Sequence, residues 1–167
     1  MAYQTHKTVT AIITARFRDM WTTAYRISYE NVPLIPAPTG TETWMDFAIL
    51  FGGNNSGRIT IDGDFAVDRH YGIVRIKAFV PIGGYIATLL DLKDYIGKTF
   101  SSQNWKAEHL YMFPTMLGHK EARGTHYMAV IDTPFHFDHL SGDVASASVT
   151  SSVTAALTNA GSPLLGL

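Results

Sequence analysis

The side chains best suited to chemistry in this sequence are histidines near its last predicted strand. His136, Asp138 and His139 stand close together, and His126 precedes them on the same predicted strand. Strand alternation places His126, His136 and Asp138 on one face, but the two histidines lie about 33 Å apart at about 3.3 Å per residue. A zinc site needs three or four ligands, so the His136–Asp138 pair alone does not form one. We therefore expect no metal site. If the protein is instead an enzyme, the alternative is a small metal-dependent hydrolase that uses this cluster.

Other motifs typical of catalysis or cofactor binding are incomplete. Gly83 and Gly84 precede a predicted helix, where backbone amides can hold an anion, but neither GxxxxGK[ST] nor GxGxxG is present. A GxSxG nucleophile elbow is also missing, and the acid pair Asp62 and Asp64 stands in a polar loop. We therefore expect no catalytic residues, no cofactor and no enzymatic activity.

Composition predicts one globular domain without a strong electrostatic preference. The chain has 167 residues, of which 46% are hydrophobic, and its formal net charge is -1. This balance favours neither nucleic acid nor a membrane surface as a partner. The chain has no cysteine, which excludes disulfides and suits a reducing cytoplasm. No run approaches the roughly 20 apolar residues of a membrane span, so we expect a soluble protein without a secretory signal.

The first third of the sequence predicts one helix followed by two strands. Apolar residues recur three and four apart over residues 5–22, as on one face of a helix. Residues 25–29 predict a short strand, and alternation over residues 44–51 predicts a second one. The prolines between them predict an extended connector. The helix face consists of Val9, Ile12, Ile13, Phe17 and Met20.

The remaining sequence predicts a second helix between strands. Alternation predicts a strand over residues 72–80, and a helix follows over residues 85–96 with Gly97 as its C-terminal stop. Residues 105–115 and 127–137 predict two strands of a hairpin, joined by a polar connection over residues 117–124. The expected buried core includes Phe47, Ile49, Val74, Ile76, Leu89 and Leu90.

These elements predict an α+β domain over residues 1–139, with a mainly antiparallel sheet of about five strands and two helices packed on one face. Residues 140–167 form a separate segment rich in Ser, Thr and Ala, with Asp143 as the single charge and no aromatic residue. We expect this tail to be flexible or to become ordered on a partner.

Several of these structural motifs together resemble the phage tail terminator-like family, which is similar to the tail terminators of lambda-type siphophages. The likeness covers residues 5–138 in order, including strands over 105–113 and 127–137 that resemble the closing hairpin of the family. The tail over residues 140–167 departs from it. The matching residues are Asn31-Val32-Pro33, Trp44, Gly52, Gly72, Phe79-Val80-Pro81, Gly83 and the helix around Leu89, Leu90 and Ile96.

The resemblance implies a structural virion protein. Such a protein forms a ring, here of six subunits, on the head-proximal end of the tail tube, stops tube polymerisation and presents a joining surface to the head. The implied partners are other copies of itself, the tail tube protein and the head–tail connector, with no membrane and no sequence-specific nucleic acid, although DNA would pass through the ring. Assembly would take place in the host cytoplasm. A head–tail connector or a minor tail protein is the alternative within this class.

The charged loop over residues 53–69 is the expected contact surface with a neighbouring subunit or the tube. A head-to-tail contact closes into a ring when its rotation closes, and edge strands and polar loops supply such contacts. An ordinary mobile surface loop is the other interpretation. If the loop is a contact arm, its charges contribute little to folding. The candidate contact residues are Asn54, Asn55, Arg58, Asp62, Asp64, Asp68 and Arg69.

Overall fold

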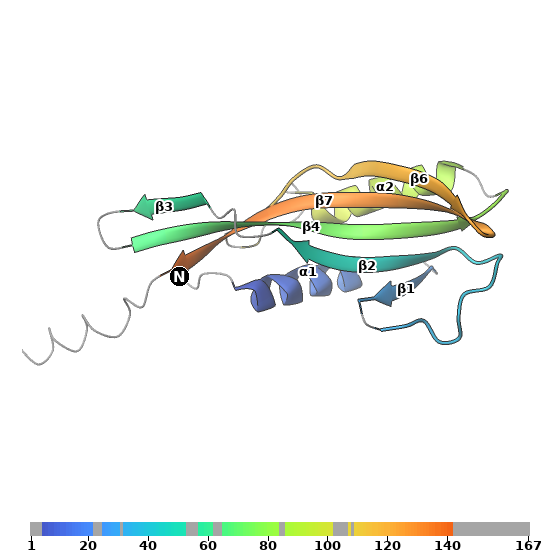
Figure 1. Cartoon of the computed structure of the whole chain (residues 1–167), viewed down its shortest axis with the longest axis horizontal. Coiled ribbons are helices and arrows are strands. Elements are labelled where there is room, and N and C mark those ends of the chain that lie inside the picture. Colours follow the sequence, from blue (N-terminus) through green and yellow to red (C-terminus); the bar gives the residue numbers. More distant parts are fainter. Residues whose placement is uncertain are drawn as a thin grey trace, which may run out of the picture.

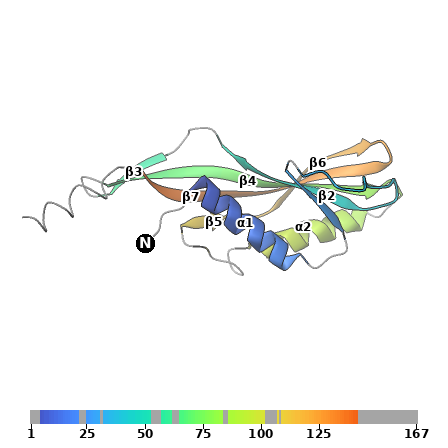
Figure 2. The same ribbon diagram turned by 90° about the horizontal axis from the view of Figure 1, so that it is seen from below.

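The computed structural model describes residues 5–21, 25–30, 32–52, 57–61, 65–83, 86–101, 107 and 109–141. These ranges form the predicted α+β fold, with a mostly antiparallel sheet and both helices on one of its faces (Figures 1 and 2). Within these ranges the sheet has seven strands, where about five were predicted. The elements are α1 (His6–Met20), β1 (Arg26–Tyr29), β2 (Trp44–Phe51), β3 (Gly57–Ile61), β4 (Phe65–Pro81), α2 (Ile86–Phe100), β5 (Leu110–Met112), β6 (Met116–Arg123) and β7 (His126–Ser141).

The centre of the sheet is one long antiparallel pair, β4 with β7. Its register runs from Ala66 opposite Ser141 to Pro81 opposite His126, a length of about 50 Å at about 3.3 Å per residue. On the side away from β7, β4 pairs with β3 over residues 65–69 and with β2 over residues 72–79. On the side away from β4, β7 pairs with β6 over residues 126–132 and with β5 over residues 135–137. β1 lies beside β2 in parallel.

The helices cover only part of one sheet face, and the core lies between them and that part (Figure 2). Phe17 of α1 stacks on Phe47 of β2 with ring centroids 4.7 Å apart, and on Phe100 of α2 at 6.1 Å. No helix in the described ranges has the length and apolar character needed to cross a bilayer. The other fully buried core side chains include Val9, Ile13, Met45, Val74, Ile76, Ile96, Ile131 and Phe135.

Two predictions about α2 were wrong. The helix continues past Gly97 to Phe100, because burial of Phe100 stabilises the last turn by more than the roughly 1 kcal/mol that an interior glycine costs. The buried face also differs from the predicted one. Leu89 is 3% exposed, but Leu90 is 47% exposed, since it lies about 100° further round the helix. Of the other expected core residues, Ile49 is only partly buried.

Two strand boundaries also differ from the predicted ones. The predicted polar connection over residues 117–124 is largely strand β6, whose hairpin with β7 turns at Gly124, with φ of +58°. The sequence pattern there is polar because an edge strand beside solvent does not need alternating apolar residues. Of the strand predicted over residues 105–115, the structure shows only β5, and residues 102–106 lie outside the described ranges.

Both central strands are longer than predicted. β4 begins at Phe65 instead of Gly72, and β7 continues to Ser141, two residues past the predicted domain boundary. Residues 142–167, the rest of the predicted tail, lie outside the described ranges.

Gly72 marks the point where β4 leaves the helix-covered part of the sheet. A Cβ atom at this position would lie 2.3 Å from Phe135 Cζ and 2.9 Å from the backbone oxygen of Leu50. Because Phe135 is fully buried and the second neighbour is backbone, neither can move away cheaply. Glycine is therefore required for the close contact between β4 and the Phe135 ring.

Candidate interaction surface

A three-stranded arm extends beyond the helix-covered part of the sheet (Figure 1). We define the arm as β3, residues 65–71 of β4 and residues 136–141 of β7. β3 pairs with β4 from Gly57 opposite Arg69 to Ile61 opposite Phe65, and β4 pairs with β7 on its other side. The loop predicted over residues 53–69 is therefore largely a β-hairpin. Residues 58–61 alone have the pattern of a short strand, because charged residues interrupt the alternation in the rest of the segment.

Arg69 joins the two long strands of the arm. Its Nε donates to Asp138 Oδ1 at 2.8 Å, and its Nη2 donates to Asp138 Oδ2 at 3.1 Å. The guanidinium lowers the pKa of the Asp138 carboxyl, and the same hydrogen bonds raise the pKa of Arg69. This two-point contact means that Arg69 contributes to the fold by joining β4 to β7. The interpretation of residues 53–69 as a loop whose charges contribute little to folding did not include this role. Contact of Arg69 with a partner stays a prediction.

The other candidate contact residues are placed unevenly. Asp68 lies in β4 opposite His139 of β7 and opposite Arg58 of β3. The backbone of Arg58 belongs to β3, but its side chain lies outside the description. The four remaining candidates lie wholly outside the described ranges. They are Asn54, Asn55, Asp62 and Asp64.

The histidines singled out in the sequence do not form one site. His136 lies in an aromatic surround, where its ring is stacked 4.7 Å from Tyr111 and lies 5.4 Å from Phe113 and 6.0 Å from Tyr71. Partial burial lowers the pKa of His136, and the nearby Arg69 charge acts in the same direction. Within the described ranges, no group of three or more His, Asp or Glu side chains is placed to hold a metal ion.

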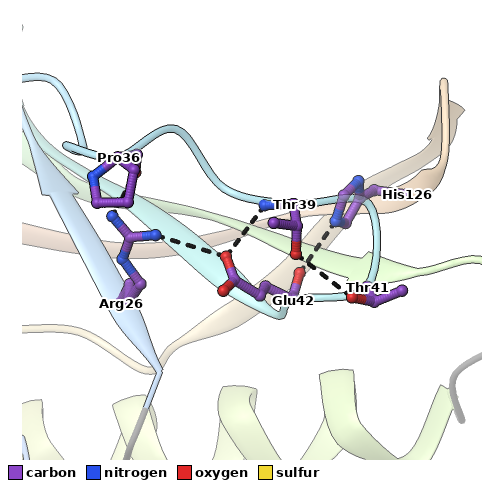
Figure 3. A network of polar contacts seen from close by, with 6 residues as sticks. All are labelled: Arg26, Pro36, Thr39, Thr41, Glu42 and His126. Carbon is purple, nitrogen blue, oxygen red and sulfur yellow. Dashed lines mark hydrogen bonds and ion pairs between the residues drawn. The ribbon is translucent and has the colours of Figure 1, made fainter.

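His126 lies at the opposite end of β7 and holds the proline-rich connector in place (Figure 3). Its Nε2 lies 3.0 Å from the backbone oxygen of Glu42, and its Nδ1 lies 3.1 Å from Thr125 Oγ1. The Glu42 carboxylate in turn accepts from the Thr39 amide at 3.0 Å and from Arg26 at 3.4 Å. This network fixes residues 39–42 against the β6–β7 turn. We assign His126 a structural role.

A second histidine cluster lies at the root of the arm, on the helix-covered face. The His6 ring at the start of α1 lies 4.6 Å from Phe51, 5.2 Å from Phe137 and 5.0 Å from His70. His70 and His139 lie 5.9 Å apart. Desolvation lowers the pKa of His6, and repulsion by the other two histidines lowers it further. Sequence analysis missed this cluster, because it depends on the β4–β7 register and on where α1 begins.

The sheet face opposite the helices, called the open face below, combines ion pairs with exposed apolar side chains. Arg75 binds Asp132 through two hydrogen bonds of 2.9 and 2.8 Å, in the same geometry as the arm pair. Beside the arm, a pocket of about 310 Å³ opens between β2, β4 and the segment after β5. Its described lining is almost entirely apolar and includes Leu50, Tyr71, Ile73, Phe113 and Pro134.

Comparison with known proteins shows a shared fold. No protein-family model matches the chain, and no curated protein matches it significantly. One solved protein, known only by a sequence label that states no function, superposes with a TM-score of 0.55 at 13% sequence identity. The match covers 80% of this chain and 96% of the other. At this identity the similarity concerns the fold alone.

Proposed function

We propose that the protein is a structural component of a phage tail, a terminator that forms a ring on the head-proximal end of the tail tube and stops its polymerisation. Two lines support the proposal. The first is the resemblance of residues 5–138 to the tail terminator-like family. The second, which carries most weight, is the arm that extends past the helix-covered core.

The arm is suited to contacts between chains. β3 pairs with β4 and with no other described strand, so its outer edge has backbone groups available to a further strand. Extended segments that add to such an edge gain main-chain hydrogen bonds. If each copy places its arm on a different part of the next copy, the contact is head-to-tail and produces a ring when the rotation closes.

In this proposal the protein has no catalytic role and no cofactor. Its partners are further copies of itself in a ring of six, the tail tube protein and the head–tail connector, and it is located in the virion after assembly in the host cytoplasm. DNA would pass through the ring without sequence-specific contacts. A head–tail connector or a minor tail protein would use the same kind of ring, so the position in the particle separates these functions.

The decisive measurement is tail length in particles that lack this protein. A terminator predicts tubes of uncontrolled length, whereas a connector predicts tubes of normal length that fail to join heads. Either normal tubes or intact infectious particles would contradict the proposal.

The role of the arm is tested separately in the purified protein. In one variant, an Asn-Gly turn replaces residues 53–70 and links Gly52 to Tyr71, which retains the β2–β4 pairing. We expect this variant to keep its helices by circular dichroism and to lose ring formation by light scattering and negative-stain microscopy. Rings of normal size from the shortened chain would exclude the arm as the contact.

A further inference from the structure

The pocket on the open face is an apolar groove that the described part of the chain leaves uncovered. Leu50 of β2 and Tyr71 of β4 form one side, and Phe113 and Pro134 form the other. Tyr71 of the central strand β4 is 48% exposed, and Phe113, whose backbone amide donates to the Pro134 carbonyl of β7, is 44% exposed. Water against this much aromatic and aliphatic surface is unfavourable, so an apolar occupant would be stabilised there.

The groove has the size and chemistry of a short-peptide site. Its volume of about 310 Å³ lies at the lower end of the range of ligand pockets, about 300–1,000 Å³. None of its described lining residues is charged. Flat aromatic rings beside small apolar side chains form the type of groove that binds proline-containing segments in an extended conformation. The matching ligand is therefore an uncharged segment with a proline followed by aliphatic residues.

The chain itself contains such a segment close to its C-terminus. Residues 163–167 read Pro-Leu-Leu-Gly-Leu, and Asp143 is the single charged side chain after Ser141. The preceding residues are mainly Ser, Thr and Ala, so the apolar side chains best suited to fill the groove are those of Pro163, Leu164 and Leu165.

The distances allow this segment to reach the groove of its own chain. β7 ends at Ser141, seven residues beyond Pro134, so the return path measures about 23 Å along the strand. The 21 residues between Ser141 and Pro163 extend up to about 75 Å. The entropy cost of closing such a loop grows only slowly with its length. A tethered segment also has an effective concentration far above that of a second molecule in dilute solution.

We propose that residues 163–167 bind in the open-face groove of their own chain, with Pro163 against the aromatic rings and the two following leucines beside Leu50 and Ile73. The tail thereby covers the groove in the isolated protein. The proposal concerns the purified single chain and does not depend on the function in a phage tail.

The test compares three full-length or nearly full-length proteins by NMR at low concentration. In the first, Leu164→Ser and Leu165→Ser remove the apolar side chains. In the second, residues 161–167 are deleted. In the third, the control, Val149→Ser and Val153→Ser change apolar tail residues outside the proposed segment. We expect the first two proteins to show the same shifts of the Leu50 and Ile73 methyl signals relative to the unchanged chain, and the control to show none.

A synthetic peptide of residues 157–167 provides the second measurement. We expect it to bind the deleted protein at the same methyl groups, and to bind the unchanged chain at least about tenfold more weakly, because the tethered segment competes with it. A peptide with serine at both leucine positions should not bind. Unchanged methyl shifts in the deleted protein, or peptide binding elsewhere, would overturn the proposal. Shifts that appear only at high protein concentration, together with a dimer mass by light scattering, would assign the groove to the tail of a second copy and would also overturn it.

Discussion

The two halves of the β4–β7 pair share strands and register but are stabilised differently. In the covered half, residues 72–81 with 126–135, Val74, Ile76 and Ile131 are completely buried beneath the helices. In the arm half, residues 66–71 with 136–141, Phe137 and Val67 are buried, and the strands are also joined by the Arg69–Asp138 pair. The covered end of this long pair is thus packed beneath two helices, whereas the arm end combines a few buried apolar side chains with polar and ring contacts. We infer that the arm can unfold locally while the helix-covered core stays folded.

The largest expected effect concerns the apolar covering of the first half. Leu89→Ala should destabilise the protein by about 2–5 kcal/mol, because it leaves a cavity between α2 and the sheet. Leu90→Ala is the matched control and should cost less than about 1 kcal/mol, since Leu90 is half exposed. Urea denaturation of both variants measures the difference. Equal losses at the two positions would show that the register of α2 is wrong.

A smaller effect should distinguish the two Arg–Asp pairs, one in each half. Asp138→Asn should weaken the arm by about 1–3 kcal/mol, because Arg69 loses a charged acceptor in two hydrogen bonds. Hydrogen exchange should then become faster at arm amides and remain unchanged over residues 74–80. Asp132→Asn removes the equivalent partner of Arg75 and should instead affect the covered half. Equal acceleration everywhere in both variants would mean that arm and core unfold as one unit.

The Arg69–Asp138 pair should make the stability of the arm depend on pH in the acid range. Because Arg69 lowers the pKa of Asp138, the folded arm binds fewer protons than the unfolded chain. The stabilisation is therefore complete above the ordinary Asp pKa of about 4 and is lost as the pH falls through the lowered value. In Asp138→Asn the protection of arm amides should lack this acid dependence. An unchanged acid profile in that variant would assign the dependence to another group.

The smallest expected effect lies at the junction of the halves, where α1 begins. The lowered pKa of His6 means that the folded protein disfavours its protonation. Stability should be constant above about pH 7 and decrease as the pH falls below the ordinary His pKa of about 6.5. His6→Gln should make this decrease smaller, with His136 accounting for part of the remainder. His119→Gln, on the exposed side of β6, is the control, and the same slope in all three proteins would contradict the assignment.

Local sequence patterns were sufficient where a helix or strand faces the core. Strand β2 has the predicted bounds because Met45 and Phe47 alternate with more exposed neighbours. Helix α1 buries Val9, Ile13 and Phe17 of its predicted face, although Met20 at its C-terminal end is exposed. The arm could not be predicted in the same way. Asp68, Arg69 and His70 carry no apolar alternation, and they form a strand because β3 and β7 pair with them.

The candidate surfaces were even less accessible to sequence analysis. Tyr71, Phe113 and Pro134 come from three segments, and a groove exists only because the sheet register brings them together. The same is true of His6 and His139, which are near opposite ends of the described chain and meet around His70. The sequence can indicate which side chains are suited to a binding surface, but the strand pairing determines which of them become neighbours.

The late position of β7 in the chain has a consequence for synthesis on the ribosome. β4 ends at Pro81, but the strand that pairs along its whole length begins only at His126. Until residues 126–141 emerge from the ribosome, the nascent chain exposes the long unpaired edge of β4. Such edges readily pair with other chains, and contacts between distant segments form slowly. The growing chain therefore depends on β7 to protect its longest strand, and a pause in translation before residue 126 should increase its aggregation.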